Sequence, residues 1–60
     1  MNRLDLIHGE VFVNAREIGT VECRGRERWE ALDYAGRSHG DRWLSAWYAA
    51  EALQRALGLA

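Results

Sequence analysis

The sequence predicts an α+β fold, in which a three- to four-stranded antiparallel sheet packs on one C-terminal amphipathic helix. Short apolar and β-branched segments, separated by glycine-containing turns, fill the first two thirds of the chain and are typical of antiparallel strands. An alanine-rich segment with apolar residues every three to four positions follows, and this spacing is typical of an amphipathic helix. Because the chain has 60 residues, we expect a single small domain spanning residues 1–60.

The N-terminal end is predicted to form a β-hairpin. Residues 4–7 and 10–13 are the two strands, and His8-Gly9 between them has the length and the glycine of a two-residue turn. Two continuations are open after Val13. Asn14 either turns the chain into a further strand or caps a helical turn with Glu17 reaching back, and we expect the turn.

Residues 18–37 are predicted to hold two or three more strands, with turns at Gly25-Arg26 and Ala35-Gly36. In the segment 27–34, Trp29 and Ala31 alternate with Glu30, Leu32 and Tyr34, so either register buries apolar side chains. The sequence therefore leaves open which face of this strand points to the core.

The C-terminal helix is predicted over residues 43–57, with Gly58 as its left-handed cap. Two starting points are open, because Asp41 is a suitable cap for an unbroken helix, whereas residues 42–47 also suit a last strand with the helix beginning near Tyr48. Helix and strands together give the predicted core: Val11, Val13, Val21, Leu32, Trp43, Trp47, Ala50, Leu53 and Leu57.

Composition excludes several classes of protein. A formal net charge of −1 is unlike the strongly basic footprint of a dedicated nucleic-acid binder, although all eight basic residues are arginine. The single cysteine forms no internal disulfide, and no apolar run is long enough for a signal peptide or a membrane span, so we expect a cytoplasmic protein with no membrane partner.

Catalytic and metal-binding patterns are missing from the sequence. The metal-ligand residues Cys23, His8 and His39 are separated, and no phosphate-binding loop, paired-histidine motif or nucleophile elbow occurs. We therefore predict a non-enzymatic protein without metal or cofactor.

Several short motifs between residues 18 and 57 resemble those of the AP2/integrase-type DNA-binding domain. They are Gly19-Thr-Val, Trp29-Glu-Ala-Leu, Tyr34-Ala-Gly-Arg, Trp43-Leu-Ser-Ala-Trp and Glu51-Ala. That family packs a three-stranded antiparallel sheet on one helix and lays the sheet in the DNA major groove. The resemblance implies nucleic-acid contacts by Arg24, Arg26, Arg28, Trp29 and Arg37. This sequence departs from the family pattern because acidic residues are interleaved among the arginines, and acids repel phosphates.

The interleaved acids suggest a second function. On adjacent strands they form a patch that imitates phosphates and occupies a basic protein groove: Glu22, Glu27, Glu30 and Asp33. In size and composition the chain resembles the anti-CRISPR inhibitors of phages. That resemblance implies a phage or mobile-element inhibitor that blocks a nucleic-acid-binding surface of a host defence complex such as a CRISPR effector.

Two further possibilities concern surfaces rather than motifs. Trp43, Trp47 and Tyr48 form an aromatic stripe that we expect to pack on the sheet, and the alternative is that one of them points outward as a protein-binding hot spot. The chain is either a monomer or a homodimer joined through the helix or an edge strand.

Overall fold

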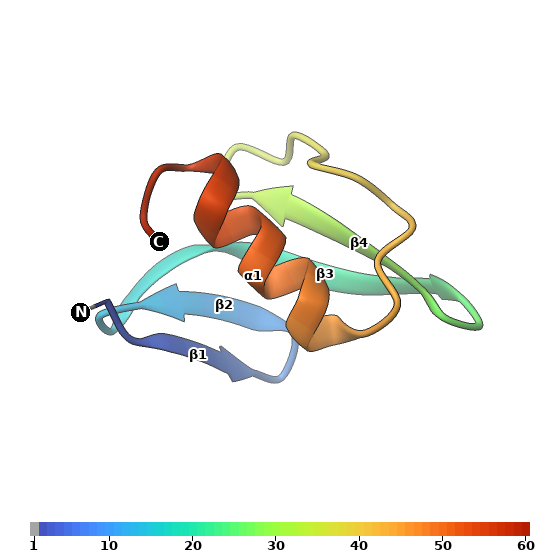
Figure 1. Cartoon of the computed structure of the whole chain (residues 1–60), viewed down its shortest axis with the longest axis horizontal. Coiled ribbons are helices and arrows are strands. Elements are labelled where there is room, and N and C mark those ends of the chain that lie inside the picture. The colour runs from blue at the N-terminus through green and yellow to red at the C-terminus, as the bar shows by residue number, and fades with distance from the viewer. Residues whose placement is uncertain (1) are drawn as a thin grey trace.

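The protein is described by a computed structural model that covers residues 2–60. A four-stranded antiparallel sheet carries one helix on one of its faces, which confirms the predicted α+β class (Figure 1). Each strand pairs with the next one along the chain, in the order β1-β2-β3-β4. The elements are β1 (Leu4–Ile7), β2 (Glu10–Val13), β3 (Arg16–Gly25), β4 (Arg28–Asp33) and α1 (Ala46–Ala56).

Two tight turns connect the first three strands. His8 and Gly9 have φ angles of 51° and 81°, and Asn14 and Ala15 have φ angles of 53° and 68°. Positive φ at both central residues suits the right-handed twist of the flanking strands. Two hydrogen bonds of 2.8 Å also join Asn14 to Arg3. The backbone N–H of Asn14 donates to the Arg3 carbonyl, and the backbone N–H of Arg3 donates to Asn14 Oδ1. The predicted turn at Asn14 is confirmed, and no helical turn forms there.

The β3–β4 hairpin resolves the register that the sequence left open. Its turn is Arg26-Glu27, one residue later than predicted, and β3 begins already at Arg16. Ala31 is completely buried and Trp29 packs against the core, so this side of β4 faces the helix. Leu32 is on the opposite face and outside the core cluster, and its predicted place in the core is wrong.

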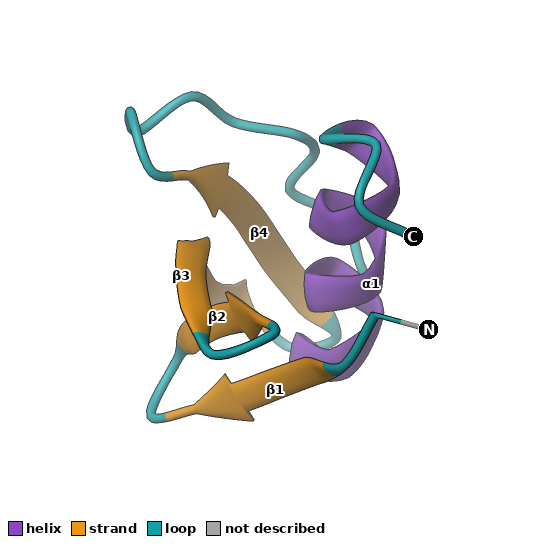
Figure 2. Cartoon of the chain, turned by 90° about the vertical axis from the view of Figure 1, so that its left-hand side faces the viewer, coloured by secondary structure: helices purple, strands orange, loops and turns teal. Residues whose placement is uncertain are grey.

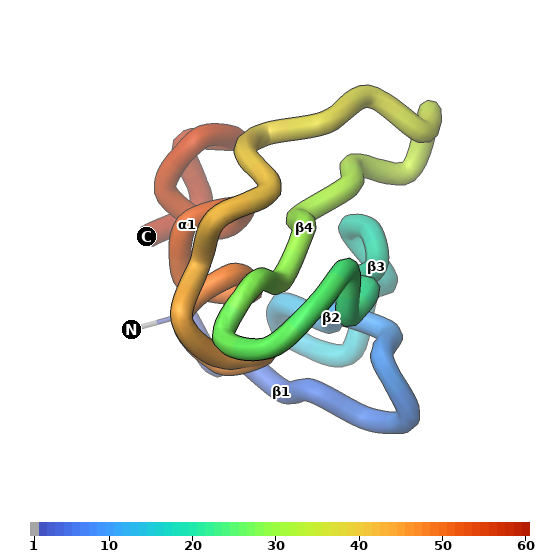
Figure 3. The backbone as a smooth tube through the Cα atoms, turned by 90° about the vertical axis from the view of Figure 1, so that its right-hand side faces the viewer, coloured from blue at the N-terminus to red at the C-terminus, as the bar shows by residue number. Residues whose placement is uncertain are grey.

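The segment 37–43 runs along the outer edge of β4 and returns the chain to α1 (Figure 3). Trp29 and Trp43 exchange two backbone hydrogen bonds of 2.8 and 3.1 Å. The carbonyl of Ala31 accepts a hydrogen bond of 2.7 Å from the His39 N–H, and the Ala31 N–H donates one of 2.9 Å to the Gly40 carbonyl. These bonds satisfy backbone groups that an edge strand otherwise exposes.

The helix begins two residues before Tyr48, close to the later of the two predicted starts, and an unbroken helix from Asp41 is wrong. Its first residue is Ala46, and Ser45 is the N-cap, because the backbone N–H of Tyr48 donates to Ser45 Oγ over 3.2 Å. At the other end Gly58 has a φ of 71° and its N–H bonds to the Arg55 carbonyl, as expected for a C-terminal cap.

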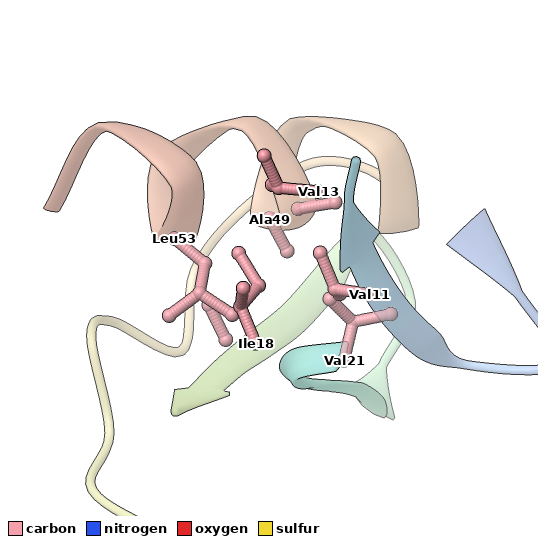
Figure 4. Packing of buried hydrophobic residues seen from close by; sticks show 8 residues of the cluster. Val11, Val13, Ile18, Val21, Ala49 and Leu53 are labelled. Carbon is pink, nitrogen blue, oxygen red and sulfur yellow. The ribbon is translucent and has the colours of Figure 1, made fainter. Parts of the chain in front are cut away.

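The face that α1 turns to the sheet consists of alanines and one leucine. Ala49, Ala50 and Leu53 are completely buried against the valine and isoleucine side chains of β2 and β3 (Figure 4). Trp47 is 45% exposed and Leu57 38% exposed, so their predicted places in the core are wrong.

The helix is turned so that its alanines and Leu53, and not Trp47, face the sheet, because it lies close to β3. A Cβ atom added at Gly19 would lie 2.7 Å from Leu53 Cδ2 and closer still to the carbonyl oxygen of Leu32. A large aromatic side chain does not fit into so narrow a gap, whereas alanine does. The predicted positions of Val11, Val13, Val21, Ala50 and Leu53 in the core are confirmed, and Trp43 packs at its margin.

Candidate functional site

The face of the sheet that points away from α1 is the candidate site, and we call it the open sheet face (Figure 2). Side chains alternate between the two faces of a strand, and directly paired residues share a face. The pairs Asp5–Phe12, Phe12–Glu17, Glu10–Thr20 and Glu22–Glu30 all alternate with buried core residues. Five carboxylates therefore lie on this face: Asp5, Glu10, Glu17, Glu22 and Glu30.

Apolar side chains lie between these carboxylates. Ile7 is 51% exposed, and Phe12 and Leu32 are half-buried on the same face. Since no helix of residues 2–60 covers this side of the sheet, the open sheet face combines negative charge with contact area that a partner could bury.

Arg24 neutralises part of the negative charge. The β3–β4 register shifts between Cys23 and Gly25, and this bulge contains Arg24. Its guanidinium binds Glu30 at 2.7 Å and Glu22 at 3.1 Å. Glu22 and Glu30 are directly opposed, and without a shared cation they would repel each other. Hydrogen bonds from the Ser38 side chain and from Arg24 lower the pKa of the Glu30 carboxyl below its ordinary value.

The four acids predicted as one patch are not all brought together. Glu22 and Glu30 are neighbours, and Glu27 lies in the turn at the end of the same hairpin. Asp33 pairs with Gly19 and belongs to the helix-facing register. Its carboxylate lies 3.0 Å from His39 Nε2 and accepts two backbone N–H groups from the segment that follows β4. Asp33 therefore holds the loop of residues 35–39 in place through these hydrogen bonds.

The same contacts determine the protonation of Asp33. The His39 ring, then the backbone N–H groups of Arg37 and Ala35, favour the carboxylate, so the pKa of Asp33 lies below its ordinary value.

Sequence reasoning missed Asp5, Glu10 and Glu17 as members of the acidic face. The signal was available for Asp5 and Glu10, because each of them alternates with apolar residues of the predicted hairpin. Glu17 lies on this face because the β2–β3 register shifts between Val11 and Phe12, and simple alternation along β3 would have placed it on the other face.

The residues implied by the resemblance to DNA-binding domains are distributed over several surfaces. Arg24 is on the open sheet face, and Trp29 is on the helix-facing side. Arg28 binds Asp41 at 3.4 Å, Arg26 is in the hairpin turn, and Arg37 follows β4 in the segment at the sheet edge. These five positions do not share one face of the sheet.

Within residues 2–60, no group of three or more histidine, cysteine, aspartate or glutamate side chains is arranged to hold a metal ion. Cys23 is an exposed thiol whose Sγ lies 3.3 Å from the Gly25 carbonyl. None of the helices found there has the length and apolar character needed to cross a membrane.

Comparisons with protein-family models, with curated proteins and with solved structures each found no match.

Proposed function

We propose that this chain is a non-enzymatic binding protein whose open sheet face occupies a basic, nucleic-acid-binding surface of a protein partner. The partner class is a host defence complex in the bacterial cytoplasm, such as a CRISPR effector, and the chain acts as a phage or mobile-element inhibitor of the anti-CRISPR kind. The observation that carries the proposal is the gathering of five carboxylates on one uncovered face of the sheet.

The charge balance of that face supports the proposal. Among residues 2–60, Arg24 binds Glu22 and Glu30, and Arg3 binds Asp5 at 3.2 Å. Glu10 and Glu17 form no ion pair with any residue of that range. By the same alternation Arg28 also lies on this face, and it binds Asp41 at 3.4 Å. Five carboxylates against three arginines leave the face negative, although the whole chain is close to neutral. A negative face accelerates encounter with a basic groove and disfavours wrong partners.

Apolar side chains on the same face supply the contact energy that charge alone does not. Phe12 and Leu32 are half-buried, and Ile7 is half-exposed, so each retains surface that binding would remove from water. Exposed charge pairs in water contribute little to affinity, whereas buried aromatic and aliphatic anchors dominate most interfaces.

Duplex DNA binding is the competing function. The arrangement in its favour is a sheet with one C-terminal helix on one face and an uncovered opposite face, as in the AP2/integrase-type domains. Phosphates laid on the open sheet face would meet its five carboxylates, which is why we prefer a protein partner.

The experiment measures displacement of a labelled target duplex from purified RNA-guided effector complexes by fluorescence anisotropy. The double variant Glu10→Lys/Glu17→Lys reverses two unpaired charges of the open sheet face, and Glu51→Lys on the helix is the control, compared with Glu17→Lys alone for an equal change of charge. We expect the unmodified chain and Glu51→Lys to displace the duplex, and the double variant to lose this activity.

Two results would reject the proposal. One is displacement by the double variant at the same concentration as by the unmodified chain. The other is salt-sensitive binding of the isolated chain to duplex DNA that disappears on removing Arg24 or Arg26, which would establish the competing DNA-binding function.

A further inference from the structure

A second surface lies on the other side of the molecule, where the chain enters α1. Three large side chains are exposed there: Leu44 by 62%, Tyr48 by 54% and Trp47 by 45%. In a domain of 60 residues, leaving these side chains in water forgoes stabilisation that their burial would provide. Exposed aromatic residues next to arginines are typical of protein-binding surfaces.

The surface contains a cleft of about 250 Å³. It is lined by Arg42, Trp43, Leu44, Tyr48 and Arg55, and we call it the Trp43 cleft. Pockets for drug-sized molecules and cofactors usually have volumes of about 300–1,000 Å³. The Trp43 cleft is smaller than that range and suits one large side chain.

The walls of the cleft are held in place before any ligand binds. The backbone of Trp43 is paired with Trp29, and its indole N–H donates to the His39 carbonyl over 3.3 Å. Gly40 lies directly against the indole, because a Cβ atom there would be 2.8 Å from Trp43 Nε1. Tyr48 belongs to the first turn of α1, which Ser45 caps. A preformed cleft costs little ordering entropy on binding.

The charges at the cleft indicate an acidic ligand. Neither Arg42 nor Arg55 forms an ion pair within residues 2–60. Glu51 lies between Tyr48 and Arg55 on the same side of the helix, so two guanidinium groups stand against one carboxylate. Arginine is well suited to bind carboxylates because its planar fork matches both oxygens.

We propose that the Trp43 cleft binds a peptide segment of a partner protein that presents one large apolar side chain between acidic residues. The apolar side chain fills the cleft between Trp43 and Tyr48, and the flanking carboxylates pair with Arg42 and Arg55. This contact is separate from the open sheet face, so it extends the proposed function to two partners or to two sites on one partner.

A nucleic acid and a second copy of the chain are the other occupants to be tested. Single-stranded nucleic acid also uses aromatic stacking and arginines, but binding proteins of that kind combine them with a long basic groove, whereas this chain has a net charge of −1. Tyr34 is 76% exposed and follows the acidic residue Asp33. If a second copy of the chain were the occupant, Tyr34 would be the side chain best able to enter the cleft.

The test uses the full chain labelled with ¹⁵N and a synthetic peptide, acetyl-Gly-Asp-Asp-Phe-Asp-Asp-Gly-amide, in a nuclear magnetic resonance titration. We expect shifts confined to residues 42–48 and 55, including the indole N–H of Trp43. Affinity should fall at least about tenfold, equivalent to about 1.4 kcal/mol, in Tyr48→Ser, in Arg55→Gln, and with a peptide in which serine replaces phenylalanine. Tyr34→Ser and Arg26→Gln are the matched controls and should bind the peptide as the unmodified chain does.

Five results would overturn the proposal. Four of them are absence of any shift up to about 1 mM peptide, shifts located on the open sheet face, tighter binding of an octathymidine strand at the same residues, and concentration-dependent shifts at the cleft without peptide that vanish in Tyr34→Ser. The third result would assign the cleft to nucleic acid, and the fourth to a second copy of the chain. Loss of the peptide response in the two control variants would also contradict it.

Discussion

Replacing Gly19 by alanine tests the close contact between helix and sheet. The added Cβ would meet the Leu32 carbonyl oxygen, Leu53 Cδ2 at 2.7 Å and the Asp33 Cα at 3.0 Å. Two of these atoms belong to the backbone of β4, so no side-chain rotation relieves the overlap. Overpacking a core typically costs about 1–3 kcal/mol, and a clash with backbone lies at or above the upper end, so we expect a loss of at least about 3 kcal/mol.

That loss is large compared with the stability of so small a domain. At about 0.05–0.15 kcal/mol per residue, a chain of 60 residues is stable by roughly 3–9 kcal/mol. The assay is urea unfolding followed by tryptophan fluorescence and circular dichroism. We expect Gly19→Ala to be largely unfolded or to have a much lower midpoint. Gly25→Ala is the matched control, because its Cβ would have only ordinary contacts of 3.9 Å with Arg28. A Gly19→Ala midpoint that corresponds to a loss below about 1 kcal/mol would refute the close-packing argument.

Two further predictions concern the helix cap and the response to acid. Ser45→Ala removes the side-chain acceptor of the Tyr48 N–H and should cost about 1 kcal/mol in urea unfolding, so an unchanged midpoint would contradict the assigned cap. Because the folded pKa values of Asp33 and Glu30 lie below their ordinary values of 3.8 and 4.5, both groups stabilise the fold above those values, and this stability is lost as the pH falls through the folded pKa values. Unfolding midpoints at about pH 7 and pH 3 measure this loss, which should be smaller in Asp33→Asn; an equal loss in that variant would argue against the assigned role of Asp33.

Local signals in the sequence predicted the hairpins correctly. His8-Gly9 and Asn14 marked the first two turns, and the valines of β2 and β3 alternated as half-buried strands do. The helix and its Gly58 cap followed from spacing and composition. These features depend on residues close together in sequence, so the sequence alone was sufficient to predict them.

The errors concern packing between distant segments. Aromatic and alanine residues both recur at helical spacing in α1, and hydrophobicity favoured burying Trp47. The buried face is instead set by Gly19, far away in sequence, whose missing side chain admits Leu53 and the alanines. The pairing of Trp43 with Trp29 is likewise non-local, and it keeps the chain extended at Trp43, so the helix begins only at Ala46.

The same separation applies to the candidate sites. Four acids of the open sheet face follow from strand alternation and could have been identified from the sequence, whereas the position of Glu17 depends on the bulge between β2 and β3. The Trp43 cleft could not, because it depends on the rotation of α1, which leaves Tyr48 and Arg55 on the outer side next to Arg42. Sequence reasoning had left open whether one residue of the aromatic stripe points outward, and both Trp47 and Tyr48 do.

The segment 37–43 also limits how copies of this protein can aggregate. It occupies the outer edge of β4 with backbone hydrogen bonds, so of the two outermost strands within residues 2–60 only β1 has an unpaired outer edge. Growth of an amyloid-like stack requires two open edges on every molecule, one to receive a neighbour and one to offer to the next. Joining two molecules through β1 leaves no outer strand edge of the sheet for a third. We therefore expect strand addition at the ends of the sheet to produce a pair rather than a fibre.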